Sequence, residues 1–550
     1  MNNWRHSDKH SQQNPNGQSV PGIKFLLLPG FLASLLLAWT AFAPQQPVLA
    51  HGATCYVNGL WFNGHAFEAK TFCSVEGLLR ANYDGKADNT IDLKGRHIIP
   101  PFAEAHNHHF GDGADIRQQI KTYLSQGIFY AKNTNNTQKL TAPLRQFVNL
   151  PESVDVLYAN GGLTATGGHP MQIYDVMASQ IPGWTPKDMQ NQAYFVIDSE
   201  QELNRKWPLI LSGKPDFIKT YLEYSEQYEA RKNDSAFYGK RGLDPRLLPK
   251  IVRRAHASSL RVAVHINTAE DFRNAVRSGA DEITHLPLEK LTAEDARQAA
   301  RRGAVVVTTT LSHRPTGQVP DVDEVHRHNL KLLQQAKVRL AAGTDDNNRT
   351  VLDEAGNLLR LRAFDNLTLL KVLVEVTPQT IFPSRKIGRL ESGYEASFLA
   401  LEGSPLDDFA NLKKVAMRVK KGHLLVIAPD PPKKPSIVDE IAHTLMRDGL
   451  AAAISDYRRL RKEQFEVYDF SERELNRLGY DLLKQQRVAD AIEIFKLNVE
   501  IFPNAANAYD SLGEAYLKAG DQGLAAKNYR KSLELNPHNA NAAEVLKKIQ

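Results

Sequence analysis

Short apolar runs alternate with amphipathic helical stretches through the middle of the chain. Between Pro101 and Arg385 the apolar runs include "DFIKTYL", "RVAVHIN", "GAVVVTTTL" and "VRLAAGTD". Strands that alternate with helices in this way are typical of a parallel α/β fold. The length of about 285 residues suits a (β/α)8 barrel. We therefore predict an α/β fold with a TIM barrel over residues 101–387.

The segments on either side of this region have a different pattern. From Cys55 to about Leu93 the chain reads as short strands separated by turns, and strand patterning returns in "IGRLESGYEASFLALEGSP" and "VAMRVKKGHLLVI". Residues 51–100 and 388–427 are therefore expected to be β-structure that flanks the barrel in sequence.

The C-terminal part is predicted to be all-α and repetitive. A proline-rich linker, "APDPPKKP", opens residues 428–470, which we assign to a linker and helices. In residues 471–550 four positions recur 34 residues apart, namely Gly479 and Gly513, Ala491 and Ala525, Phe495 and Tyr529, and Pro503 and Pro537. This period resembles the tetratricopeptide repeat (TPR), which implies a protein partner. An ordinary helical hairpin tail is the alternative.

The N-terminus predicts export. A polar leader with Arg5, Lys9 and Lys24 precedes the uncharged stretch from Phe25 to Phe42, and small residues follow near Ala50. This is the pattern of a signal peptide over residues 1–50, and it predicts an exported protein, periplasmic or secreted. A retained membrane anchor is the alternative, because 18 apolar residues are close to the minimum for crossing a bilayer.

The two cysteines agree with export. Cys55 and Cys73 are 18 residues apart, and the Asn63-Gly64 turn signal lies between them. The two could face each other across a hairpin, and an oxidising compartment would join them in a disulfide. Because the chain has only these 2 cysteines, a thiolate metal site is excluded.

Composition narrows the class of protein further. The chain of 550 residues is 42% hydrophobic and 24% charged, which is a normal globular balance and predicts two or three domains. The formal net charge is only +6, without a long basic run. A nucleic-acid partner is therefore not expected.

The candidate active-site residues lie where the apolar runs end. In "IIPPFAEAHNHHFGDG", His106 and His108 would share one face of a strand, while Asn107 and His109 point to the other. Later runs end in Lys219, His265, His285 and Asp345. In a barrel the C-terminal ends of the strands meet on one face, so all six side chains can converge.

At these residues the sequence resembles the amidohydrolase superfamily. The superfamily has a His-x-His after the first barrel strand, a lysine after the fourth, single histidines after the fifth and sixth, and an aspartate after the eighth. The six residues here match in kind and order: His106, His108, Lys219, His265, His285 and Asp345. The resemblance covers roughly residues 53–427 and implies that both flanks of the barrel form a small β-sandwich.

The resemblance also implies a binuclear metal site. His106, His108 and Asp345 would hold one divalent ion, His265 and His285 the other, and a carboxylated Lys219 would bridge them together with a hydroxide. Imidazoles and carboxylates suit Zn²⁺, and paired ions activate water and polarise a carbonyl. Asp345 would be the catalytic residue, first as general base and then as general acid.

The loop "GGLTATGGHP" points to the peptidase and prolidase-like branch of the superfamily. In that branch a GGH loop follows the third strand, which implies that His169 contacts the carbonyl or carboxylate of the substrate. Pro170 stands where the branch usually has glycine, "GIFYAKNTNNTQ" has Lys132 where an arginine-aspartate pair is usual, and Ala396-Ser397 replaces Ala-Asp. These departures indicate an atypical substrate pocket.

We therefore expect an exported binuclear hydrolase that cleaves amide bonds of dipeptides, N-acyl amino acids or related small amides through a metal-activated hydroxide. One alternative keeps the metal site and changes the substrate to lactones, phosphotriesters or cyclic amides. A second alternative is a non-catalytic scaffold that works through its TPR helices. A membrane would be involved only if the N-terminal segment were retained.

Overall fold

The computed structural model describes residues 52–111, 115–181, 184–312, 321–427, 434–536 and 539–549. The predicted signal peptide lies outside these ranges. Within them every helix is too short or too polar to cross a lipid bilayer.

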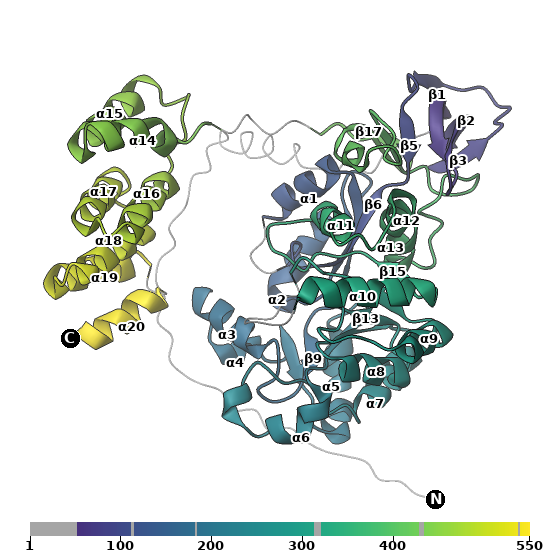
Figure 1. The fold of residues 1–550 in the computed structure, drawn as a ribbon, viewed down its shortest axis with the longest axis horizontal. Helices are drawn as coiled ribbons and strands as arrows, with labels where there is room; N and C mark the ends of the chain where they lie inside the picture. Colours follow the sequence, from purple (N-terminus) through teal and green to yellow (C-terminus); the bar gives the residue numbers. More distant parts are fainter. Residues whose placement is uncertain are drawn as a thin grey trace, which may run out of the picture. The chain divides into compact units, whose positions relative to one another are not determined.

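Parallel strands form the centre of the larger part of the molecule (Figure 1). One sheet has the order β6-β7-β8 and the other has the order β10-β9-β11-β12-β13-β14-β15. Their bounds are β6 Phe102–Asn107, β7 Ile128–Asn133, β8 Asp155–Tyr158, β9 Gly162–Thr164, β10 Tyr194–Val196, β11 Ile218–Tyr221, β12 Val262–His265, β13 Glu282–Thr284, β14 Val305–Val307 and β15 Arg339–Ala341. The predicted parallel α/β architecture is confirmed.

Helices lie between these strands in the chain and around them in space (Figure 1). Their bounds are α1 Ile116–Ser125, α2 Gln138–Thr141, α3 Met171–Gln180, α4 Pro186–Met189, α5 Glu200–Ser212, α6 Tyr228–Arg231, α7 Leu248–Ala257, α8 Ala269–Ser278, α9 Ala293–Arg302, α10 Val322–Gln335, α11 Val351–Arg360, α12 Asn366–Lys371 and α13 Thr377–Ile381. Short 3-10 helices cover Ala142–Phe147, Ser225–Gln227, Ser235–Phe237 and Phe409–Lys413, and a π-helix covers Val372–Val376.

Local sequence explains where the helices of this region begin and end. Thr268 caps the N-terminus of α8 in a capping box with Asp271, and α9 begins in the same way at Thr292. Gly279 and Gly303 end these two helices in the left-handed conformation, which glycine adopts without steric cost. The neighbouring strands β12, β13 and β14 are fully buried, as expected when helices cover the outer face of a parallel sheet.

Backbone hydrogen bonds connect the two parallel sheets at both edges. The amide of Ala105 in β6 donates to the carbonyl of Ala342 after β15 at 3.0 Å, and the amide of Asp216 before β11 donates to the carbonyl of Tyr158 in β8 at 2.8 Å. The third strand of the predicted barrel is divided into β8 and β9, because the backbone between them turns at Asn160, which has a positive φ of 57°. A closed eight-stranded barrel remains a prediction.

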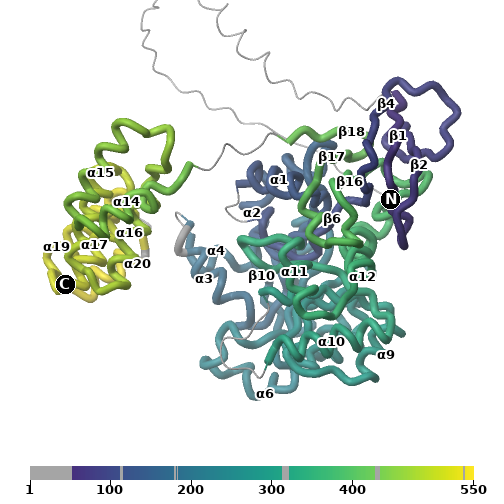
Figure 2. Tube along the Cα trace, turned by 45° about the horizontal axis from the view of Figure 1, so that its top comes forward, coloured from purple at the N-terminus to yellow at the C-terminus, as the bar shows by residue number. Residues whose placement is uncertain are grey.

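Both flanks of this region contribute strands to one mixed sheet. The hydrogen-bonded order is β18-β17-β16-β5-β1-β2-β3, and β4 also pairs with β1. The bounds are β1 Thr54–Phe62, β2 Phe67–Val75, β3 Leu78–Ala81, β4 Asn89–Asp92, β5 His97–Ile99, β16 Phe398–Leu401, β17 Val415–Lys420 and β18 His423–Leu424. Figure 2 shows β16 beside β17. Because β1 is long enough to pair with β4 and β5 in succession, all eight strands belong to one hydrogen-bonded sheet. The β-sandwich expected from both flanks remains a prediction.

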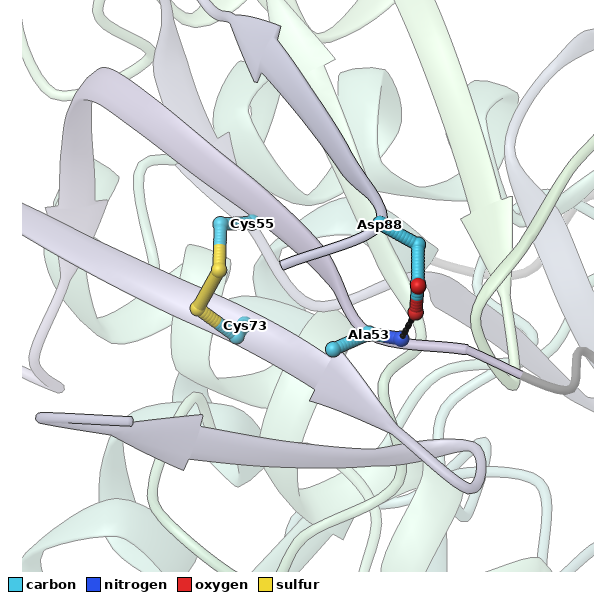
Figure 3. Close-up of a disulfide and its surroundings, with 4 residues drawn as sticks. All are labelled: Ala53, Cys55, Cys73 and Asp88. Atoms are coloured by element: carbon cyan, nitrogen blue, oxygen red, sulfur yellow. Dashed lines mark hydrogen bonds between the residues drawn. A yellow bond between two sulfur atoms is a disulfide. The ribbon is translucent and has the colours of Figure 1, made fainter. Parts of the chain in front are cut away.

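Cys55 and Cys73 form a disulfide across the β1–β2 hairpin (Figure 3). They are direct partners in the strand register. The hairpin turns at Asn63, whose side-chain oxygen accepts hydrogen bonds from the amides of His65 and Ala66. Beside the disulfide, the amide of Ala53 donates to the carboxylate of Asp88 at 2.6 Å.

Two cationic side chains, one in the flanking sheet and one in the segment that leads into it, form ion pairs with one carboxylate of the parallel strands. Asp155 in β8 lies 2.7 Å from the Nζ of Lys420 in β17 and 2.8 Å from Arg385. Lys420 and Asp155 are both buried. This cluster ties the strand that returns after the barrel region to the edge of the parallel sheet.

The C-terminal helices form pairs with their own core. Their bounds are α14 Ile437–Arg447, α15 Leu450–Glu463, α16 Glu472–Lys484, α17 Val488–Ile501, α18 Ala506–Lys518, α19 Gln522–Leu535 and α20 Ala540–Ile549. The repeated glycines lie against the repeated aromatic rings: a Cβ on Gly479 would lie 2.4 Å from Phe495, and one on Gly513 would lie 3.2 Å from Tyr529. Helices α14 and α15, which lie in the segment predicted as linker and helices, share a core with α16 and α17. The assignment of the helical array as TPR remains a prediction.

Candidate active site

The six residues that end the apolar runs line one cavity of about 880 Å³. They are His106, His108, Lys219, His265, His285 and Asp345, and His169 lines the same cavity. The six predicted residues lie in or after five strands: His106 and His265 are within the last two residues of β6 and β12, His108 and His285 directly follow β6 and β13, Lys219 is the second residue of β11, and Asp345 lies four residues after β15. The convergence predicted from strand ends is therefore present in the structure.

His106, His108 and Asp345 form the tightest group in this cavity. The Oδ1 atom of Asp345 lies 3.2 Å from the Nε2 atom of His106 and 3.0 Å from that of His108. The other ring nitrogen of His108 lies 3.3 Å from the carbonyl oxygen of Asn135. If that nitrogen carries the proton, the lone pair of Nε2 is directed to the side of Asp345, as metal-ligating histidines require.

The backbone after β15 brings Asp345 to this position. Asp345 has a left-handed φ of 54°, and its amide donates to the carbonyl of His106 at 3.0 Å. Gly343 makes this close approach possible, because a Cβ there would lie 2.6 Å from the backbone nitrogen of His106. Buried Glu104 accepts hydrogen bonds from the amide and the hydroxyl of Thr344 and so fixes the preceding residue.

His285 lies next to both His106 and His265. The ring centroid of His285 is 5.0 Å from that of His106 and 4.4 Å from that of His265. His285 has a positive φ of 83°, and its Nδ1 atom lies 2.7 Å from the hydroxyl of Thr309. These contacts hold His285 between the two other imidazoles.

Lys219 is buried at the base of the cavity. Its side chain is only 2% exposed, and its Nζ atom has no hydrogen-bond partner among the described residues. Burial lowers the pKa of Lys219 to about 7. A second buried lysine, Lys132, forms a 2.7 Å ion pair with Glu282 and is therefore compensated, whereas the amine of Lys219 is not.

The electrostatics of the tight group suit a cation. Burial lowers the pKa of His106 to about 3, which keeps this imidazole neutral at physiological pH. Burial raises the pKa of Asp345, but His106 and then His108 lower it more, so the carboxyl group stays ionised. Neutral imidazoles beside an ionised carboxylate are the donor set that Zn²⁺ and similar divalent ions bind.

His169 stacks on His265, with ring centroids 4.9 Å apart. Its loop is held by the hydroxyl of Thr164, which donates to the carbonyl of His169 at 2.6 Å, and by the amide of His169, which donates to the carbonyl of Arg241 at 2.9 Å. Pro170, the departure noted in the sequence, leads directly into α3. The loop thus places His169 in the cavity with proline at this position.

Sequence reasoning missed two cavity residues on the segment after Lys219. Tyr221 and Glu223 line the cavity, and the side chain of Glu223 lies near both His169 and His265. The signal was present, because Lys219, Tyr221 and Glu223 are alternate residues and alternate residues of an extended segment share a face. Ile173 and Met177 from α3 add an apolar wall to the cavity.

Comparisons with known proteins agree with this geometry. The sequence model of the amidohydrolase family matches residues 98–425. No curated protein sequence matches the chain.

Solved structures share the fold at low identity. One amidohydrolase structure has a TM-score of 0.55 and 21% identity, covering 69% of this chain and 100% of its own. A prolidase in complex with N-methylphosphonate-L-proline has a TM-score of 0.54 and 18% identity, covering 68% and 99%. The ochratoxinase of A. niger has a TM-score of 0.55 and 17% identity, covering 68% and 95%.

The residues present fit a divalent metal ion. Two imidazole nitrogens and one carboxylate oxygen converge within 4.8 Å in the His106, His108 and Asp345 group, and the buried amine of Lys219 on the same cavity lacks a hydrogen-bond partner among the described residues. The family match covers the strands that carry all six of these residues. The chain therefore belongs to the amidohydrolase family and is a metal-dependent amidohydrolase.

Proposed function

We propose that this enzyme hydrolyses the amide bond of dipeptides, N-acyl amino acids or related small amides with two divalent ions, which we infer to be Zn²⁺. The observation that carries the proposal is the convergence of His106, His108 and Asp345 in the cavity that also contains the buried Lys219. A cavity of about 880 Å³ is large enough for a small peptide or acylated amino acid.

The ligand assignment follows the order of the strands. His106, His108 and Asp345 hold the first ion, and His265 and His285 lie on the side of the second. Lys219 is proposed to carry a carbamate that bridges the two ions, which would turn a buried cation into an anionic ligand. Bound divalent ions in such a site lower the pKa of water and polarise a carbonyl group.

The protein side chains then have separate tasks. Asp345 accepts the proton of the attacking water and delivers it to the leaving amine, because its carboxylate contacts His106 and also lines the cavity. His169 contacts the carbonyl or carboxylate of the substrate from the loop before α3.

The apolar wall provides room for a hydrophobic side chain or acyl group. Ile173 is 50% exposed although it lines the cavity, and Met177 lies one turn further along α3. Large exposed apolar side chains beside a polar centre are typical of a substrate site. Similar structures named prolidase, Xaa-Pro dipeptidase and ochratoxinase suggest which amides belong in the first assays.

The test combines metal content with a Lys219→Ala variant. Elemental analysis should give about two ions per wild-type chain, and release of amino acid should be measured from Xaa-Pro and other dipeptides and from N-acyl amino acids. Lys219→Ala should lose metal and activity together, while Lys250→Ala, at a partly exposed lysine of α7 that does not line the cavity, should retain both. A folded wild type that stays without metal and inactive after metal is supplied would contradict the proposal. Lactones and phosphotriesters in the same panel test the alternative substrates.

We also propose that the protein is exported. The Cys55–Cys73 disulfide supports this, because disulfides persist in oxidising compartments. Expression of the full chain in a bacterium, followed by fractionation and N-terminal sequencing, is the test. A mature protein that begins near residue 51 is expected, and an uncut protein in the membrane fraction would favour the anchor.

Two structural assignments are proposed alongside the function. The parallel strands are proposed to close into an eight-stranded barrel, supported by the hydrogen bonds at both sheet edges. The C-terminal helices are proposed to be TPR units that bind a protein partner, supported by the packing of Gly479 against Phe495 at the repeated positions. A crystal structure tests the first, and cross-linking in cells with and without residues 434–549 tests the second.

A further inference from the structure

Arg231 is a cationic side chain on the cavity wall that the proposed metal site leaves without a role. It is the last residue of α6, and it lines the same cavity as the six predicted ligands. Within the described ranges, no aspartate or glutamate oxygen lies within 4.0 Å of its guanidinium group, and Glu223 on the same wall is farther away. A guanidinium group in a cavity without an acidic partner is suited to bind the anionic group of a ligand.

The neighbours of Arg231 hold its guanidinium group in one orientation. The Nε atom donates to the side-chain oxygen of Gln227 at 2.9 Å, and the Nη1 atom donates to the carbonyl of Lys240 at 2.8 Å. The ring centroids of Tyr224 and Phe237 lie 3.7 Å and 4.6 Å from the Cζ atom. These contacts use only part of the five N–H groups of arginine, and the Nη2 atom has no hydrogen-bond partner among the described residues.

Lys240 brings a second positive charge to this wall. Its side chain is exposed and lines the cavity. The segment that carries Lys240 is joined to the loop of His169, because the amide of Gly239 donates to the carbonyl of Gly167 at 2.8 Å and the amide of His169 donates to the carbonyl of Arg241 at 2.9 Å. The cationic wall and the loop of His169 are therefore held at a fixed distance from each other.

The chemistry of the proposed substrates indicates which anion belongs on this wall. Dipeptides and N-acyl amino acids differ in their acyl part, but all of them carry the α-carboxylate of the amino acid that cleavage releases. The apolar side chains of Ile173 and Met177 line another part of the cavity and suit the acyl part. Arginine and a carboxylate form charge-assisted hydrogen bonds, which are among the strongest in proteins.

We propose that Arg231, assisted by Lys240, binds the α-carboxylate of the amino acid that leaves on cleavage. The substrates are then amides with a free carboxylate, and neutral amides of the same shape are poor substrates. This inference rests on the proposed function and narrows its substrate class. It also leaves His169 to contact the carbonyl group of the substrate.

The experiment compares pairs of substrates that differ in charge alone. Each dipeptide or N-acyl amino acid that the wild type hydrolyses is assayed beside its C-terminal carboxamide, and kcat and KM are determined for both. The carboxamide keeps the shape of the substrate and lacks the negative charge. In the wild type its kcat/KM should be lower by about 10–100-fold, the range expected for loss of hydrogen bonds to a charged group.

Substitution of Arg231 should change this preference. Arg231→Gln should lower kcat/KM for the carboxylate member of each pair, mainly through KM, and have little effect on the carboxamide, because the interaction is the same in the ground state and the transition state. Arg231→Lys keeps the charge and should keep part of the preference. Metal content should stay at the wild-type value in both variants.

Matched controls separate substrate recognition from general effects of the substitution. Arg246→Gln makes the same change at an exposed arginine outside the cavity lining and should keep the wild-type preference. A further substrate pair keeps the free α-carboxylate and has glutamate or glutamine in the acyl part. The wild type should not prefer the glutamate member.

Three outcomes would overturn the inference. One is a wild type that hydrolyses carboxylate and carboxamide equally well. Another is an Arg231→Gln protein in which kcat/KM falls by the same factor for both members, as a merely structural role of the arginine predicts. The third is a preference that follows the acyl glutamate instead of the α-carboxylate.

A second variant decides if Arg231→Gln does not fold by circular dichroism. Lys240→Met, at the exposed lysine of the same wall, should then reduce the preference for the carboxylate, and an unchanged preference would contradict the proposal. Lys232→Met is its control, at a lysine that does not line the cavity. A wild type that binds no metal and hydrolyses neither member of any pair would instead contradict the proposed function itself.

Discussion

Gly343 packs directly against the backbone of His106, so that a Cβ atom at Gly343 would lie 2.6 Å from the His106 nitrogen and 2.8 Å from its Cβ. The contact joins the last strand of the parallel region to the first. It sets the distance between the histidines after β6 and the aspartate after β15.

Gly343→Ala should therefore damage the metal site. The added methyl group has backbone atoms as neighbours, which cannot move aside easily, and overpacking of this kind costs about 1–3 kcal/mol of stability. Because the displaced residue is His106 itself, metal content and kcat/KM should fall together. Elemental analysis and thermal unfolding measure both effects.

Gly356→Ala is the matched control for that change. Gly356 lies in α11, and a Cβ there meets nothing within 4 Å. Alanine is a better helix former than glycine, so this variant should gain about 0.5–1 kcal/mol and keep full activity. Equal effects at the two glycines would show that the contact with His106 has no functional role.

Asp345→Asn should abolish activity without unfolding the protein. The amide lacks the negative charge that binds the cation, and it cannot accept the proton of the attacking water. We expect kcat/KM to fall by at least about 1,000-fold, at the upper part of the range for general acid-base catalysis. Asn tolerates the left-handed φ of 54° as well as Asp does, so the melting temperature of the metal-free protein should not fall. Asp346→Asn at the next residue is the control and should remain active.

Removal of the disulfide should affect stability and leave the chemistry intact. The double change Cys55→Ser and Cys73→Ser opens a loop of 18 residues, for which loop-closure entropy predicts about 3 kcal/mol. Both cysteines lie in the flanking sheet, and neither lines the cavity. Denaturant unfolding with and without reductant measures the loss, and metal content should stay at the wild-type value. A loss of metal in the double variant would contradict this assignment.

Lys420 should make stability depend on pH in the alkaline range. Burial lowers the pKa of Lys420 to about 8 in the folded protein, from an ordinary value of 10.5. Between these values the unfolded chain holds the proton and the folded protein has released it, so stability should rise with pH from about 8 to about 10.5. The total gain is at most about 3 kcal/mol.

The contribution of Lys420 is measured by comparing the pH dependence of the unfolding free energy in the wild type and in variants. Lys420→Met should have a flatter dependence of unfolding free energy on pH than the wild type, while Arg385 keeps Asp155 paired. Lys414→Met, at an exposed lysine near the start of β17, should follow the wild type. Parallel curves for wild type and Lys420→Met would contradict the prediction.

The positions of the candidate site residues could be predicted from the sequence, whereas the contacts between residues far apart in the chain could not. His265 ends β12, and His106 and Asp345 lie at or just beyond the ends of β6 and β15, where periodic apolar runs end. The end of a strand is marked by the local apolar pattern, and barrel enzymes place their active-site residues at the C-terminal ends of the strands. The location of these residues can therefore be predicted from one sequence. The parallel α/β class follows for the same reason.

Other features depend on contacts between distant residues. Lys132 looked like a departure from the family pattern, yet it pairs with Glu282, 150 residues away, in the buried interior. The position of Glu223 beside His169 depends on where the loop of His169 lies. The division of the third strand depends on one left-handed residue, Asn160. No local pattern contains these three-dimensional relationships.

The left-handed backbone at His285 and Asp345 has an evolutionary consequence. Such conformations cost about 1–3 kcal/mol at a residue other than glycine, and here they occur at two of the six predicted ligands. Replacement by glycine would relax the backbone at either position and remove a ligand at the same time. Selection for a more stable fold and selection for the metal site therefore act in opposite directions at these two positions. In a lineage that no longer needs catalysis, His285 and Asp345 should be among the first residues to be replaced.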